Sequence, residues 1–178
     1  MKKIILIALI GISLVACNSK PSLQEYLVEK ENSVEFISAS LPTNLLFQNL
    51  DSLSPEENSS LRKIEKINLL ALTNKKGKTM LEEERLKLKS VLEQPAYESL
   101  LDFSSSGREA ELLFVGSEGN IDELIFFGYD SEIGMLLLRM RGSDVNANDI
   151  YQITQTAQRM DMNALTGDFG DLLGDLGQ

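Results

Sequence analysis

Four apolar segments of strand length follow one another in the second half of the chain, and the links between them constrain the fold more than any other feature. Each link is short and rich in Ser, Gly, Asn or Asp, which are turn-forming residues. Links of this length join antiparallel neighbours, because a parallel crossover needs about a dozen residues or more. The sequence therefore predicts an antiparallel meander of four strands, at residues 97–103, 109–115, 121–127 and 135–140.

Helix signals and two further strands precede the meander. Ser22 and Thr79 each begin a capping box with a glutamate three residues on, and Pro55 suits the first position of a helix. Glu83 and Lys87 are spaced for a favourable ion pair on the helix after Thr79. In order, the predicted elements are a helix over 23–31, a strand over 34–38, a helical turn over 45–50, a helix over 55–63, a strand over 67–72 and a helix from 81 to Pro95.

A last helix follows the meander, because Ile150, Ile153, Ala157 and Met160 recur at helical spacing. This helix can cover one face of the sheet. Strands in one run, with helices before and after, indicate a single α+β domain of two layers over residues 22–160. We expect a mostly antiparallel sheet, made of the four-strand meander plus the earlier strands, covered by amphipathic helices.

Residues 161–178 form an acidic, glycine-rich tail outside this domain. Its apolar residues fall at helical spacing, but glycines interrupt them, and each glycine weakens a helix by ~1 kcal/mol relative to alanine. The tail is expected to be a solvated chain end or a docking peptide for a groove on a partner. The apolar residues are Met162, Leu165, Phe169, Leu172 and Leu176, and the interrupting glycines are Gly167, Gly170 and Gly174.

The N-terminus has the three-part layout of a secretory signal peptide. Two lysines precede a mostly apolar run of 11 residues, which is too short to span a bilayer, since a membrane helix needs about 20 residues. The segment 14–17, Leu-Val-Ala-Cys, resembles the lipobox of bacterial lipoprotein precursors. We therefore expect removal of residues 1–16, attachment of diacylglycerol and palmitate chains to Cys17, and a lipid-anchored linker over 17–21. The alternative is an ordinary secretory signal with a chance cysteine.

Cys17 is the single cysteine of the chain, so no intramolecular disulfide can form. Two or more acyl chains on this residue would hold the protein firmly at a membrane. Asn18 follows it, where an aspartate would indicate retention at the inner membrane in the enteric pattern. We therefore expect the outer membrane, with the domain facing the periplasm.

The chain beyond the predicted signal peptide is strongly acidic. Removing residues 1–16 takes away Lys2 and Lys3 and leaves 15 basic against 27 acidic residues, a net charge of −12. Nucleic acid is excluded as a partner, because its recognition begins with a basic surface that neutralises phosphates. Anionic lipid headgroups are repelled as well, so the membrane contact is expected through the anchor at Cys17.

No complete catalytic motif is present. The chain contains no histidine, which excludes Ser-His-Asp and Cys-His nucleophiles and zinc sites built on imidazole. Gly77-Lys78-Thr79 resembles the end of a phosphate-binding loop. That motif needs a glycine five residues earlier, where Leu72 stands, so we expect Gly77 in an ordinary loop.

A run of Asp and Asn from Asp144 resembles the start of a calcium-binding loop. Asp149 takes the place of the glycine that such a loop requires, and Gln155 the place of its bidentate glutamate. Capping of the last helix explains these residues with fewer assumptions. The sequence therefore predicts no metal ligand and no cofactor-binding residue.

Two apolar segments follow the signal peptide: Val-Glu-Phe-Ile-Ser at 34–38 and Ile-Glu-Lys-Ile-Asn-Leu-Leu at 64–70. A Glu/Lys-rich helix, the hairpins and a closing amphipathic helix come after them. This layout, over residues 22–160, resembles a family of small Bacteroidota lipoproteins known as domain of unknown function 4252. The resemblance implies an α+β envelope domain with no established activity, and it carries over no catalytic residue.

These observations favour a non-enzymatic outer-membrane lipoprotein that binds another component of the envelope. A carboxylate hydrolase of glycans is a second possibility, and it predicts a cleft lined by two acids with separated pKa values. A carrier of a small apolar ligand is a third, and it predicts an enclosed apolar cavity of several hundred Å³.

Overall fold

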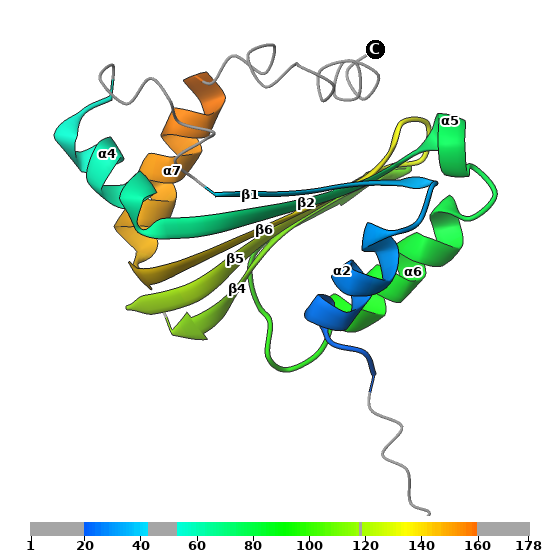
Figure 1. Ribbon diagram of the computed structural model, residues 1–178, viewed down its shortest axis with the longest axis horizontal. Coiled ribbons are helices and arrows are strands. Elements are labelled where there is room, and N and C mark those ends of the chain that lie inside the picture. Colours follow the sequence, from blue (N-terminus) through cyan, green and yellow to red (C-terminus); the bar gives the residue numbers. More distant parts are fainter. Residues whose placement is uncertain (1–19, 43–52, 118, 160–178) are drawn as a thin grey trace, which may run out of the picture.

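In the computed structural model, which describes residues 20–42, 53–117 and 119–159, six strands form one antiparallel sheet in the order β1-β2-β6-β5-β4-β3 (Figure 1). The predicted meander is confirmed, because β3 to β6 each pair with the next strand along the chain. β2 then pairs with β6, and β1 with β2, which adds the earlier strands at one edge. The strands are β1 (Phe36–Pro42), β2 (Ile64–Thr73), β3 (Glu98–Ser105), β4 (Arg108–Ser117), β5 (Asn120–Asp130) and β6 (Gly134–Val145).

Local chemistry fixes the turns of the meander. The turn between β3 and β4 contains Gly107, whose φ of 72° lies in the left-handed region that favours glycine. The turn between β5 and β6 is held by Asp130, whose carboxylate accepts hydrogen bonds from the backbone N–H groups of Glu132 (2.8 Å) and Ile133 (3.2 Å). These short connections set the register of the strands that they join.

Most helices begin at the polar residues that the sequence predicts. They are α2 (Leu23–Glu31), α4 (Pro55–Arg62), α5 (Asn74–Gly77), α6 (Leu81–Leu92) and α7 (Ala147–Arg159). Ser22 and Ser54 each form a complete capping box with the glutamate three residues on. The predicted cap at Thr79 is wrong, because Met80 is the N-cap of α6 and makes no side-chain capping bond. The chain enters α6 from the short helix α5 through a turn in which Met80 donates its N–H to the Gly77 carbonyl (3.0 Å).

The helices pack on both faces of the sheet, at opposite ends (Figure 1). α2 and α6 form one core with residues such as Leu70 and Phe127, on what we call the α2–α6 face. α4 and α7 form a second core with residues such as Ile67 and Leu124, on what we call the α4–α7 face. Because side chains alternate along a strand, neighbouring residues of β5 enter different cores. Each end of the sheet is therefore two layers thick.

The predicted α+β class, with its mostly antiparallel sheet, is confirmed. The limits of the early strands differ, since β1 begins at Phe36 rather than at residue 34 and β2 begins at Ile64 rather than at residue 67. Four predicted features lie outside the described residues: the signal peptide, Cys17, the helical turn over 45–50 and the tail over 161–178. None of the described helices has the length and apolar character needed to cross a membrane.

Candidate binding surface

One end of each sheet face carries no helix among the described residues, and the two ends differ in chemistry. On the α2–α6 face the uncovered end is polar, and Arg139 there donates hydrogen bonds to Glu123 across β5 and β6 and to Gln24 of α2. On the α4–α7 face the uncovered end is apolar. A solvated sheet face is normally polar, so this apolar end is the unusual feature. The residues of the polar end are Ser40, Lys66, Asn68, Glu123, Arg139 and Arg141.

Two complete rows of apolar residues cross the uncovered end of the α4–α7 face. Residues directly opposite each other in paired strands lie on the same face, so the register traces each row from one sheet edge to the other. We call the two rows together the open apolar face. The first row is Ile37, Ala71, Leu136, Gly128, Ala110 and Phe103, and the second is Ala39, Leu69, Leu138, Phe126, Leu112 and Leu101.

The open apolar face is exposed at the β3 edge and hollow in its middle. Phe103 is 53% exposed and Leu101 is 58% exposed, which places two large apolar side chains in water next to each other. On the first row the small residues Gly128 and Ala110, between Leu136 and Phe103, border a depression of about 330 Å³, and Phe126 is also among its lining residues. The depression opens onto the surface, whereas a carrier of a small apolar ligand requires an enclosed cavity.

The charged residues at the border of this depression are held by other groups. Arg108 pairs with Asp130 (Nε to Oδ2, 2.7 Å). The pKa of Asp130 is lowered, mainly by the hydrogen bond from the Glu132 backbone and also by Arg108, so this carboxylate is ionised at neutral pH. Glu109 pairs with Arg85 (2.7 Å). A glycan hydrolase needs one acid that stays protonated beside an ionised one. Asp130 is ionised, and its carboxylate holds the turn between β5 and β6.

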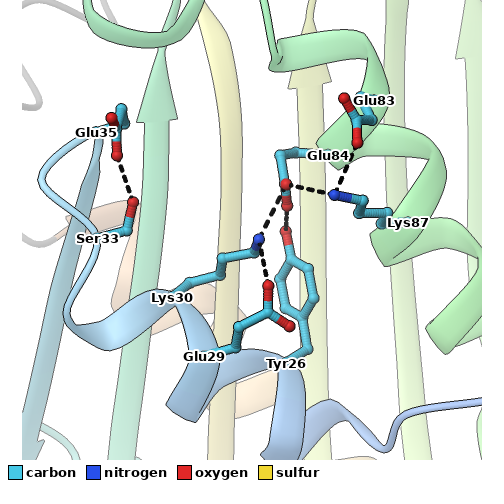
Figure 2. A network of polar contacts seen from close by, with 8 residues as sticks. All are labelled: Tyr26, Glu29, Lys30, Ser33, Glu35, Glu83, Glu84 and Lys87. Atoms are coloured by element: carbon cyan, nitrogen blue, oxygen red, sulfur yellow. Dashed lines mark hydrogen bonds and ion pairs between the residues drawn. The ribbon is translucent and has the colours of Figure 1, made fainter.

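Among the described residues, the most deeply buried charged cluster lies between α2 and α6. Figure 2 shows Glu84 at its centre, where the carboxylate accepts hydrogen bonds from Tyr26 Oη (2.9 Å), Lys30 Nζ (2.9 Å) and Lys87 Nζ (3.1 Å). Burial alone would raise the pKa of Glu84, but these hydrogen bonds outweigh burial and lower it. Burial, followed by the charge of Glu84, raises the pKa of Tyr26.

This arrangement keeps Glu84 ionised and Tyr26 protonated over the ordinary pH range. The Glu84 side chain is only 2% exposed and that of Lys30 only 9%, so neither group can reach a substrate. The cluster therefore joins α2 to α6, as a buried and fully hydrogen-bonded ion pair does. We assign it a role in the fold and not in binding.

The two partial motifs of the sequence also have structural roles. Gly77 ends α5 rather than lying in a loop, and a Cβ added there would come within 2.3 Å of Leu72 Cδ1, so its backbone is packed on the core. Asn146 caps α7 as predicted, with its side chain accepting hydrogen bonds from the N–H groups of Asn148 (3.0 Å) and Asp149 (3.2 Å). Within the described ranges, no group of three or more acidic or cysteine ligands is placed to hold a metal.

Sequence reasoning did not find the open apolar face. β5 and β6 contain continuous apolar runs, as at residues 124–127 and 135–138, which are typical of strands buried on both faces. Such a run does not reveal which part of a face a helix covers, and the register that aligns the strands becomes visible only in the structure. Cys17, the one site residue that the sequence predicts, lies outside the described residues, so its lipidation stays a prediction.

Comparison with known proteins gives one result. A family model described as a domain of unknown function (DUF4252) matches residues 29–153, which include all of the described strands and most of the described helical residues. No curated protein and no solved structure matches the chain.

Proposed function

The chain belongs to the family of the domain of unknown function (DUF4252), and we propose that it is a lipid-anchored protein of the bacterial envelope that binds a protein partner through its open apolar face. The observation that carries the proposal is the pair of apolar rows across six strands, with Phe103 and Leu101 half-exposed at the edge. Contiguous exposed apolar surface on a folded domain marks an interaction site.

The shape of this surface favours a helical segment of the partner. The small residues Gly128 and Ala110 lie between the larger side chains of Leu136 and Phe103, so this part of the first row is lower than its borders. A helix packs at about 10 Å from a partner element when its side chains fill such a hollow. The apolar stripe of an amphipathic helix would meet the two rows in the way that a helix binds in an apolar groove.

The predicted anchor at Cys17 supports the same proposal. The anchor holds the domain next to the membrane, while the net charge of −12 beyond residue 16 repels anionic headgroups. The open apolar face therefore remains available to proteins of the envelope. Lipidation itself is tested by labelling cells with radioactive palmitate, which should mark the protein and should not mark a Cys17→Ala variant.

The binding role is tested by purifying the lipidated protein from cells after chemical cross-linking. We expect one partner in high yield, and at least about tenfold less of it with Phe103→Ser, since a buried aromatic contact is worth more than about 1.4 kcal/mol. Val28 of α2 is the matched control, because it is an apolar residue that is likewise 53% exposed. Equal yields from Phe103→Ser and Val28→Ser would refute the proposed surface.

A further inference from the structure

We propose that the C-terminal segment 160–178 of the same chain binds the open apolar face and covers it when no partner is bound. This inference uses the surface described above but is independent of the partner and of the anchor. Three observations support it: the position of α7, the pattern of the segment and the charge at one end of the face.

The first observation is the position of α7, which lies on the same face of the sheet as the two apolar rows. α7 packs on the α4–α7 face through Ile153, in the same core as Leu61 of α4. α7 lies on the side of the sheet that carries the open apolar face (Figure 1), and its last residue, Arg159, directly precedes the segment in the chain. The two surfaces are continuous, because Leu112 and Leu138 of the second row also pack against the core beneath α7.

The length and pattern of the segment fit the two rows. Its apolar residues recur at intervals of three and four, which gives one stripe along a helix. A helix of 19 residues is about 28 Å long, and six strands spaced ~4.8 Å apart span about 24 Å. The stripe itself, from Met162 to Leu176, rises about 21 Å along such a helix, which is close to the distance across the six strands. It consists of Met162, Leu165, Phe169, Leu172 and Leu176.

The negative charge of the segment complements a group of lysines in and directly after α5, beside the open apolar face. The segment contains four aspartates and no basic residue. α5 and the residue after it carry the exposed residues Lys75, Lys76 and Lys78. α5 lies at the same end of the sheet as the first row, since Asn74 donates its N–H to the carbonyl of Ile133 (2.8 Å), a residue that lines the depression. Attraction between the aspartates and these lysines would orient the segment. The aspartates are Asp161, Asp168, Asp171 and Asp175.

Docking also resolves a conflict within the segment. Its glycines make a free helix unfavourable, although its apolar residues have helical spacing. Contact with the sheet would supply the apolar burial that the isolated segment lacks, as in segments that fold on binding. A partner helix would compete with the segment for the same rows, so the protein would carry its own inhibitor.

The test places photoreactive benzoylphenylalanine at Phe169 in the full chain and maps the cross-linked peptides by mass spectrometry. We expect cross-links within one chain to peptides of β4, β5 and β6 that contain Ala110, Phe126 or Leu136. Equal amounts of ¹⁴N- and ¹⁵N-labelled protein are mixed before irradiation, which separates links within a chain from links between chains. The same probe at Tyr151, an exposed residue of α7, is the control and should give no link to these peptides.

Charge reversal provides a second measurement on the same sample. The double variant Lys76→Glu/Lys78→Glu should lower the yield of the Phe169 cross-link about two- to fivefold, as expected for surface charge pairs. Links that map elsewhere, or that join ¹⁴N to ¹⁵N chains, would overturn the inference. A yield unchanged by charge reversal would also overturn it. Because no partner takes part, these outcomes are independent of the outcome of the co-purification test.

Discussion

Replacing Glu84 with glutamine should destabilise the fold by about 3 kcal/mol, because the buried ammonium of Lys30 loses its buried carboxylate partner. Three side chains donate to this carboxylate, from Tyr26, Lys30 and Lys87. The Lys30 side chain is only 9% exposed and cannot be hydrated in place. Lys30 keeps its ion pair with Glu29 (2.8 Å), which puts the loss at the lower end of the range of about 3–5 kcal/mol for buried pairs.

The assay is urea unfolding at pH 7, followed by circular dichroism. Glu83→Gln is the matched control, since Glu83 also pairs with Lys87 (2.9 Å) but is 68% exposed. This control should lose less than about 0.5 kcal/mol, as exposed helix pairs do. The double variant Lys30→Met/Glu84→Gln should lose about 1–3 kcal/mol less than the sum of the single variants, because it no longer contains the buried ammonium that loses Glu84 in the single variant. Equal losses from Glu84→Gln and Glu83→Gln, or strict additivity in the double variant, would refute this reasoning.

Four further outcomes are expected. The free energy of unfolding should fall as the pH drops below about 4.5. The pKa of Glu84 is lowered in the fold, so the ionised Glu84 stabilises the fold fully only above its ordinary pKa of 4.5. Glu84→Gln should make the unfolding free energy from urea titrations depend less on pH. Asp149→Ala should lose about 2 kcal/mol in the same assay, since its buried carboxylate accepts three hydrogen bonds. Gly134→Ala should lose about 2–3 kcal/mol, because φ is 144° and the added Cβ would come within 2.2 Å of the carbonyl oxygen of Leu72. Gly119→Ala is its control and should change the unfolding midpoint very little, since a Cβ there would have no atom within 4 Å. Phe103→Ser should leave the unfolding free energy within about 0.5 kcal/mol of the parent, as a surface substitution does, so that any loss of partner binding is not a loss of fold.

The fold class could be predicted because the signals that determine it are local. The meander follows from turn residues such as Gly107 and Asp130, and the first helix follows from the box formed by Ser22 and Glu25. The predicted pair of Glu83 and Lys87 is also confirmed, because the helix period alone brings the two side chains together.

The cap at Thr79 was mispredicted because tertiary structure decides where α6 begins. Leu81 at the start of α6 is buried in the core between α6 and the sheet. The turn that links α5 to α6 is closed by the hydrogen bond from the Met80 N–H to the Gly77 carbonyl. A polar residue at the correct spacing is therefore left outside the helix. At Ser54, by contrast, the cap residue is extended and its side chain accepts a hydrogen bond from the N–H of Glu57.

The open apolar face could not be predicted for a different reason. In β5 a single apolar run, residues 124–127, contains both Leu124, which packs in the core beneath α7, and Phe126, which belongs to the open apolar face. Which part of the face remains uncovered depends on where α4 and α7 lie over the sheet, and that position follows from contacts such as Ser60 to Asp149 (2.7 Å), which are 89 residues apart in the chain. Such long-range contacts leave no periodic signal in the sequence.

The most direct test of the proposed binding surface is photo-cross-linking in living cells, with benzoylphenylalanine placed at Phe103 in one strain and at Val28 in another. Both positions are 53% exposed, so the two strains differ in the face that carries the probe. We predict that the Phe103 probe captures one envelope protein in high yield, that the Val28 probe does not, and that a Cys17→Ala substitution abolishes the capture. Equal capture from both positions, or no capture from Phe103 in the anchored protein, would contradict the assignment of the open apolar face as a binding surface.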